Sequence, residues 1–214
     1  MTGLTDEQRE IAALLFSLPQ AGGYVLAGGA ALVALRLVER TTRDLDAFLA
    51  ARAGRDPGSV EPLMEAAAVA LVRAGWDLVV VRRHATFCRF VVTRDEYSVE
   101  IDLAIDSPPL QAVEVVDGIP VLSSLDLAGR KILATLDRAE ARDFTDLWSL
   151  SRALGRTACV DAARQLDGAV EAAAVRSAFA NIERLADAEF PVASDEVEVV
   201  RSWFKDWRDE LAGS

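Results

Sequence analysis

The sequence is poor in the residues from which many enzymes build their catalytic groups. Its 214 residues include a single histidine, His84, and two cysteines, Cys88 and Cys159. One histidine excludes a multi-histidine metal site, and it excludes a histidine-dependent triad unless His84 itself serves as the base. The cysteines lie far apart and form no metal-binding pair, which is typical of reduced, buried thiols in a cytoplasmic protein.

Long hydrophobic segments are also missing. The longest apolar runs, such as residues 66–72, are far shorter than the roughly 20 residues that span a bilayer. The N-terminal residues are acidic where a signal peptide carries positive charge. We therefore expect a cytoplasmic protein with no membrane contact.

Positive charge is limited as well. The net charge is −11, and the excess of acidic residues lies mainly after residue 100. This balance argues against a broad nucleic-acid-binding surface, although a local arginine patch can still hold an RNA. Only two of the 23 basic residues are lysines, so Lys131 and Lys205 stand out among the arginines.

Hydrophobic periodicity predicts an α+β fold, with a mixed sheet and helices at 1–122 and a helical subdomain at 123–214. In the first part we predict strands at 24–27, 41–50, 76–81, 87–93, 97–105 and 119–122, a loop at 51–62, and helices at 5–18, 30–39 and 62–74. The spacing of the runs at 76–81, 87–93 and 97–105 favours an antiparallel meander. In the second part we predict helices at 125–136, 141–154, 158–188 and 196–211.

Gly28 and Gly29 stand where the first strand ends and a helix begins. Two glycines let backbone amides approach a phosphate closely, and the start of a helix favours negative charge. A plain structural turn has the same pattern, so both interpretations stay open at this point.

Asp44 and Asp46 point to the same side of the second predicted strand, because side chains alternate along a strand. Two neighbouring carboxylates repel each other unless a cation lies between them, and divalent metal ions prefer oxygen ligands. The alternative is a solvated edge strand. The apolar residues at 47–50 favour a strand that enters the core, and with it a metal site.

A second acidic pair, Glu100 and Asp102, follows the same pattern on the last strand of the meander. We choose Asp102 as a third metal ligand, because the apolar residues at 103–105 continue inward after it. A polar outer face of the sheet is the alternative.

Together these motifs resemble the polymerase-β-type nucleotidyltransferase superfamily. The resemblance is closer to the AbiEii-like toxin nucleotidyltransferases, which include the MenT-type toxins. It is carried over about residues 22–150 by Gly28-Gly29, Arg40-x-Thr42-x-Asp44-Leu45-Asp46, Val99-Glu100-Ile101-Asp102 and, most specifically, the stretch 131–147.

Residue spacing supports the last of these motifs independently. Lys131 and Arg138 are seven residues apart and share a helical face, and Asp143 and Asp146 are three apart and share another. A turn at residues 137–140 would bring the lysine near the two aspartates. The alternative is an exposed helix with ion pairs between neighbouring turns.

The resemblance implies transfer of a nucleotide from an NTP to an acceptor hydroxyl at the 3′ end of a tRNA, as the toxin of a toxin–antitoxin system with an antitoxin partner. It implies a nucleotidyltransferase-type sheet core, a cofactor of Mg²⁺ or Mn²⁺ and four catalytic residues, Asp44, Asp46, Lys131 and Asp146. The implied metal ligands are Asp44, Asp46 and Asp102. The implied nucleotide-binding residues are Gly28, Gly29, Arg40, Thr42, Lys131, Arg138 and Asp143.

The sequence says less about the acceptor than about the residues that bind nucleotide and metal. Arg82, Arg83 and Arg89 lie in the meander, where they predict a groove for RNA phosphates or merely a solvated face. Relatives often carry a hydroxyl residue directly after the glycine pair, whereas this chain has Ala30. Two other functions therefore stay open: nucleotide transfer to a small molecule such as an antibiotic, and a catalytically weak nucleotide-binding module.

Overall fold

The structure is a computed structural model that describes residues 3–50 and 58–213. Residues 51–57 of the predicted loop at 51–62 lie outside the described residues. The chain divides into two units, Met1–Ser123 and Ser124–Ser214. The predicted α+β class is confirmed, because a mixed sheet with helices is followed by a helical segment. In the described ranges, no helix is long and apolar enough to cross a lipid bilayer.

A seven-stranded sheet forms the centre of the first unit, in the order β3-β4-β5-β2-β1-β7-β6. The pairs β2–β5 and β1–β7 are parallel and the others are antiparallel. Strands β3, β4 and β5 form the predicted antiparallel meander, whereas β6 was not predicted. The strands are β1 (Tyr24–Ala27), β2 (Asp44–Ala50), β3 (Asp77–His84), β4 (Phe87–Arg94), β5 (Tyr97–Asp106), β6 (Glu114–Val116) and β7 (Ile119–Val121).

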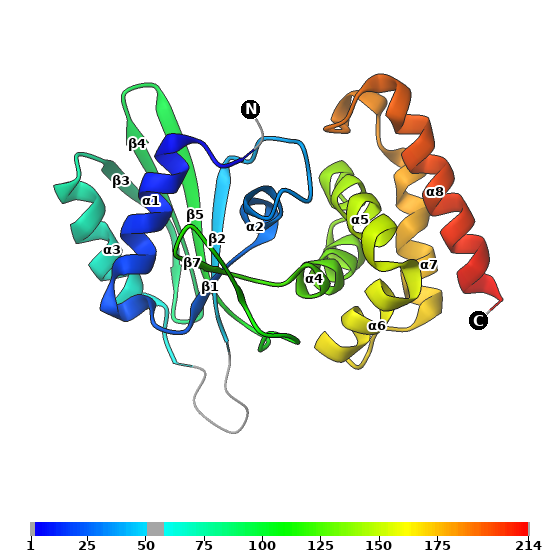
Figure 1. Cartoon of the computed structure of the whole chain (residues 1–214), viewed down its shortest axis with the longest axis horizontal. Coiled ribbons are helices and arrows are strands. Elements are labelled where there is room, and N and C mark those ends of the chain that lie inside the picture. Colours follow the sequence, from blue (N-terminus) through cyan, green and yellow to red (C-terminus); the bar gives the residue numbers. More distant parts are fainter. Residues whose placement is uncertain (1–2, 51–57, 214) are drawn as a thin grey trace. The chain divides into compact units, whose positions relative to one another are not determined.

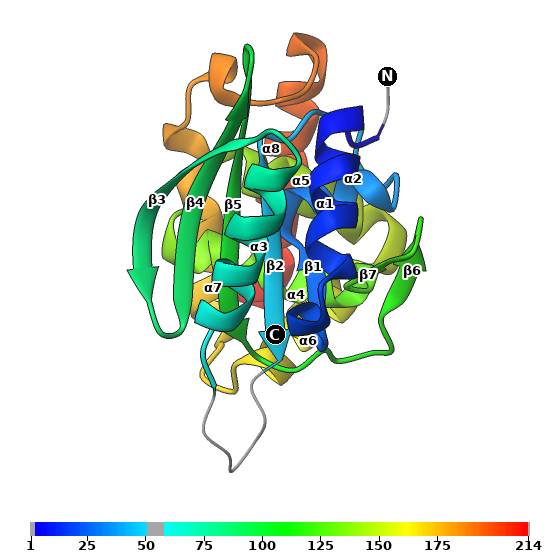
Figure 2. The same cartoon turned by 90° about the vertical axis from the view of Figure 1, so that its left-hand side faces the viewer.

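Helices α1 (Asp6–Ser17) and α3 (Glu61–Arg73) cover one face of this sheet (Figure 2). The apolar side chains that alternate along the strands point toward these helices and are buried: Cys88, Phe90 and Val92 on β4, Val99, Ile101 and Leu103 on β5, and Leu45 and Ala47 on β2. This alternation leaves the intervening polar residues on the opposite face. We call this opposite face of β2, β5, β4 and β3 the polar face.

Helix α2 (Gly28–Ala34) starts directly after β1 and packs against β1 and β2. It begins and ends earlier than the predicted 30–39. The helix stops because Arg36 adopts a left-handed backbone conformation, with φ of 57°, which an α-helix cannot contain.

The second unit consists of helices (Figure 1), which pack around aromatic side chains. Rings of Phe144, Phe179, Phe204 and Trp207 contact one another, with centroid distances from 4.9 to 6.4 Å. The helices are α4 (Ser124–Asp137), α5 (Ala141–Leu154), α6 (Arg156–Leu166), α7 (Ala172–Phe179) and α8 (Ser194–Ala212), with 3₁₀ turns at Ala180–Arg184 and Asp187–Glu189.

The single helix predicted at 158–188 is wrong, because the structure divides this segment after Leu166. The carboxylate of Asp167 accepts a hydrogen bond of 2.9 Å from the backbone N–H of Ala169, which competes with the helical pattern. Gly168 follows at the turn. Glycine disfavours a continued helix because fixing its flexible backbone costs the most conformational entropy.

At Gly129, α4 packs closely against α6, and this contact generates a stability prediction. A β-carbon at this position would lie 2.9 Å from the carbonyl carbon of Ala162 and 2.8 Å from Cδ1 of Leu166. We expect Gly129→Ala to lower the free energy of unfolding in urea by about 1–3 kcal/mol, since overpacking outweighs the better helix propensity of alanine. Gly168→Ala is the matched control, because a β-carbon there meets no atom within 4 Å. Equal stability of the two variants would contradict the close packing.

Candidate active site

The glycine pair lies against side chains from the following strand. Gly28 has a φ of +58°, and a β-carbon built on it would lie 1.7 Å from Oδ2 of Asp46. The Asp46 carboxylate therefore occupies the space that any other residue at position 28 would fill. A β-carbon on Gly29 would lie 2.8 Å from Nη2 of Arg40 and 3.1 Å from Oγ1 of Thr42. The structure thus brings Gly28, Gly29, Arg40, Thr42 and Asp46 together.

The segment before β2 is held by helix α1. Thr42 donates a short hydrogen bond from its hydroxyl to Oδ1 of Asp44. Its carbonyl accepts a hydrogen bond of 2.7 Å from Nε2 of Gln8, which is buried. Gln8 also closes the N-terminal capping box of α1 with Thr5. Sequence reasoning missed Gln8 as a support of the site, although a polar residue on the buried side of an amphipathic helix is a usable signal.

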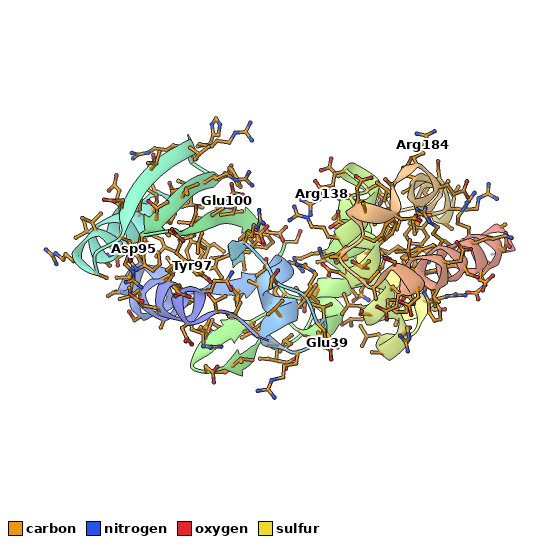
Figure 3. The ribbon with its side chains drawn as sticks, turned by 90° about the horizontal axis from the view of Figure 1, so that it is seen from above. Glu39, Asp95, Tyr97, Glu100, Arg138 and Arg184 are labelled. Carbon is orange, nitrogen blue, oxygen red and sulfur yellow. The ribbon has the colours of Figure 1, made fainter. Side chains whose placement is uncertain are left out.

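Strand β2 lies between β5 and β1, so the alternative of a solvated edge strand is wrong. Parallel pairing with β5 places Asp44 beside Glu100 and Asp46 beside Asp102. Cross-strand neighbours share a face, so the polar face carries four carboxylates on two adjacent rungs. Figure 3 labels Glu100 on this part of the sheet. Such crowding of negative charge is unfavourable unless a cation offsets it.

Arg89 on β4 supplies one such cation. Its Nε donates to Oδ1 of Asp102 at 2.8 Å and its Nη2 to Oδ2 at 2.6 Å, while Nη1 lies 3.2 Å from Oε1 of Glu100. The hydrogen bonds to Asp102 raise the pKa of the Arg89 guanidinium, and the charges of Glu100 and Asp46 act in the same direction. Both oxygens of Asp102 are thereby engaged by one arginine.

The predicted third metal ligand is therefore occupied by a protein side chain. Within residues 3–50 and 58–213, no group of three or more histidine, cysteine, aspartate or glutamate side chains is arranged to hold a metal ion. Asp44 and Asp46 remain as the pair of neighbouring carboxylates on one strand.

The three arginines predicted to line one acceptor groove lie on both faces of the sheet. Arg82 is the cross-strand partner of Arg89, and both belong to the polar face. Arg83 points the other way, where its guanidinium forms ion pairs of 2.9 and 3.0 Å with Glu61 and Glu65 of α3. The separation follows from the alternation of side chains along β3.

In the helical unit, α4 and α5 bring the predicted basic and acidic residues together. Nζ of Lys131 lies 3.0 Å from Oδ1 of Asp143 and 2.7 Å from Oδ2 of Asp146. The chain turns between the helices at Ala139, which has a φ of 52°. Lys131, Asp143 and Asp146 are buried, so the alternative of an exposed helical face with ion pairs is wrong for them.

Arg138 completes this cluster from the end of α4 (Figure 3). Its Nε donates to Oδ2 of Asp143 at 2.9 Å and its Nη2 to Oδ1 at 3.0 Å, while its side chain stays 43% exposed. Burial by itself raises the pKa of Asp143, but the hydrogen bonds from Arg138 and the charge of Lys131 outweigh it. The pKa of Asp143 therefore lies below its usual value, and the carboxylate stays ionised.

Comparisons with known proteins identify the family and the fold. The family described as "Nucleotidyl transferase AbiEii toxin, Type IV TA system" matches residues 13–213. The crystal structure of a putative nucleotidyltransferase from Helicobacter pylori is similar, with a TM-score of 0.62, 16% identity and 98% of each chain covered. The crystal structure of JHP933 from Helicobacter pylori has a TM-score of 0.60 and 16% identity, covering 99% of this chain and 96% of that one. These two structures share the fold. No curated protein matches the sequence.

The burial of Lys131 generates a prediction for the helical unit. Lys131→Ala leaves two buried carboxylates without their shared cation, so we expect the free energy of unfolding to fall by about 3–5 kcal/mol. Lys205 on α8 is exposed, and Lys205→Ala is the matched control, with an expected change within about 0.5 kcal/mol. Urea denaturation followed by circular dichroism measures both. If the two variants unfold at the same urea concentration, the Lys131 ion pairs do not stabilise the unit.

Proposed function

Because the chain belongs to the AbiEii nucleotidyl transferase toxin family, we propose that it transfers a nucleotide from an NTP to a hydroxyl of an RNA, the 3′ end of a tRNA. The observation that carries the proposal is the packing of the Asp46 carboxylate against Gly28, with Asp44 on the same face of β2. It joins the glycine turn and the carboxylate pair into one site. NTP and tRNA are substrates in the cytoplasm, where the proposal places the reaction.

The nucleotide is bound at the glycine turn. The space beside Gly28 and Gly29 is taken by Asp46, Arg40 and Thr42 and not by a β-carbon, so a phosphate that reaches the amides of this turn lies next to these three side chains. Arg40 supplies a guanidinium beside Gly29, and the Thr42 hydroxyl donates to a phosphate oxygen by exchanging its hydrogen bond to Asp44. Ala30 adds no hydroxyl of its own, so Thr42 is the hydroxyl residue of this turn.

Asp44 and Asp46 fit a divalent ion, Mg²⁺ or Mn²⁺, because they are hard oxygen donors that point to one side of a strand. A bound ion of this type supplies stabilisation of the charge that develops on the attacking and leaving oxygens. Asp102 can join the two aspartates only by exchanging Arg89 for the ion. In the transfer step, the acceptor hydroxyl attacks the α-phosphorus in line and pyrophosphate leaves.

In the helical unit, the roles divide between the cations and the aspartates that hold them. Lys131 and Arg138 are the cations of this unit that suit phosphate oxygens, and Asp143 and Asp146 fix them in position. The 2.7 Å contact between Asp146 and Lys131 orients the ammonium group and limits its rotation. Arg138 is the more accessible of the two cations, since it is 43% exposed and Lys131 is buried.

The acceptor assignment rests on the toxin family together with the polar face. A type IV toxin–antitoxin system implies an antitoxin partner as well as a nucleotide substrate. Arg82 and Arg89 place positive charge on the same face as the carboxylates, although the whole chain has a net charge of −11. Arg83, which is paired with α3, has no part in this assignment.

The test replaces each carboxylate by its neutral isostere. We expect Asp44→Asn and Asp46→Asn each to lower transfer by at least about 100-fold while the circular dichroism spectrum is retained, since the amide binds metal and offsets phosphate charge poorly. The measurement is incorporation of label from each NTP into total RNA in the presence of Mg²⁺ or Mn²⁺. Asp95→Asn is the matched control, because Asp95 is exposed in the β4–β5 turn with a φ of 55°, which asparagine tolerates.

The outcomes separate the possible functions. Full activity of either variant contradicts the carboxylate assignment. Label in a small aminated acceptor and none in RNA indicates an enzyme that modifies small molecules such as antibiotics. Binding of NTP without label in any acceptor indicates a nucleotide-binding module.

A further inference from the structure

A row of ring-bearing side chains crosses the polar face next to the carboxylates. Register places His84 on β3 beside Phe87 on β4, Phe87 beside Ala104 on β5, and Ala104 beside Phe48 on β2. The row thus contains three rings, with one small residue between Phe87 and Phe48. Figure 2 shows the four strands side by side.

Phe87 lies between two guanidinium groups. The guanidinium carbon of Arg82 is 6.0 Å from the centre of the Phe87 ring, and that of Arg89 is 5.9 Å from it. Phe90, which points to the helical side of the same strand, is fully buried, whereas Phe87 is only partly buried. Phe87 therefore lies partly exposed between two cations and, unlike Phe90, is not part of the buried core.

A β-bulge in β3 creates this arrangement. Val80 pairs with Phe90, but Arg82 pairs with Arg89, so Val81 is an extra residue in β3. Without the extra residue Val81 would face Arg89, and Arg82 would point toward the helical side. Bulges re-aim side chains and are frequent near active sites.

The bulge places two arginines directly opposite each other, which is unfavourable for like charges. Glu100 and Asp102 offset the charge of Arg89. Arg82 is exposed, and its guanidinium forms no hydrogen bond or ion pair with any residue that the structure describes. An anion bound beside Arg82 would offset this repulsion, so the position suits a phosphate of the ligand.

The row lies close to the proposed catalytic carboxylates. Arg89 shares a rung with Asp102 and Asp46, and Phe87 is one rung further along β4. Standard strand spacing and rise put the α-carbons of Phe87 and Asp46 about 12 Å apart. A short single strand whose end reacts near Asp46 can therefore place a neighbouring base on Phe87.

We propose that Phe87, flanked by Arg82, His84 and Arg89, is a stacking platform for a base of a single-stranded nucleic acid, with a backbone phosphate at Arg82. Aromatic rings stack on any base, and arginines beside them hold the backbone. A protein ligand would favour apolar neighbours around the partly exposed ring, but the ring here has cations on two sides. The inference deepens the proposed function and rests on it for the identity of the acceptor.

The test measures binding apart from transfer. Its probe is a short single-stranded RNA with one 2-aminopurine, whose fluorescence falls when the base stacks. We expect Phe87→Leu to weaken binding on the order of tenfold and to abolish the quenching, because leucine fills space but presents no ring face. Phe87→Trp should retain both. Val91→Ala, on the same strand and face, is the matched control and should bind like the wild type.

Two further comparisons separate the contribution of the stacked base to binding from that of the backbone phosphate. An oligonucleotide with an abasic site in place of the stacked nucleotide should bind the wild type and Phe87→Leu equally. Arg82→Ala should reduce the slope of log affinity against log salt by roughly 0.7, the value for one phosphate contact on a single strand. Phe87→Leu should leave that slope unchanged.

Three outcomes decide whether Phe87 is a stacking platform. Unchanged binding and quenching in Phe87→Leu overturn the platform even if the wild type labels RNA, and the proposed function then stands without it. Absence of any oligonucleotide binding by the wild type also overturns it, and capture of a protein in its place assigns the row to a protein interface. Quenching that depends on Phe87, without transfer to RNA, supports the platform and removes RNA as the acceptor.

Discussion

Parallel pairing of β2 with β5 is the constraint from which the polar face follows. It places Asp44, Asp46, Glu100 and Asp102 on two adjacent rungs, at the spacing of neighbouring strands. Carboxylates this close repel one another, so cations on the same face stabilise the sheet. Arg89 from β4 provides one cation and takes both oxygens of Asp102. A divalent ion at Asp44 and Asp46 would add to this stabilisation and would link the stability of this face to ligand binding.

The glycine turn limits where the negative charge of Asp46 can lie. Asp46 fills the space beside Gly28, so the carboxylate lies directly against the glycine turn. Gln8 and Thr42 hold the chain that leads into β2, and they do so through hydrogen bonds that involve the main chain and Asp44. A site built in this way depends on α1 as well as on the strands that carry the acids.

The charged residues of the helical unit are arranged differently from those of the sheet. Lys131, Asp143 and Asp146 are buried while Arg138 is partly exposed, and the two cations balance the two carboxylates in charge. A buried lysine between two carboxylates has little freedom, so its position is fixed before any ligand arrives. Rigid placement of this kind is what a group that binds phosphate needs, because ordering it during binding would cost affinity.

Much of this protein was determined by the sequence alone. The backbone geometry of a strand puts Asp44 with Asp46, and that of a helix puts Asp143 with Asp146, on one face whatever the rest of the chain does. The α+β class and the meander of β3, β4 and β5 followed from periodicity, and the family resemblance followed from the motifs. Helix ends were less predictable, as the break after Leu166 shows, because a single side-chain hydrogen bond at Asp167 decided it.

Only the tertiary structure decided which groups meet across strands. Capture of Asp102 by Arg89 depends on the register of β4 with β5, and the position of Arg82 depends on one extra residue in β3. Register is set by packing and turn geometry over many residues, and a shift by one position moves every side chain to the other face. For this reason the sequence could name Arg82, Arg83 and Arg89 as a group, while the fold alone separated Arg83 from the other two.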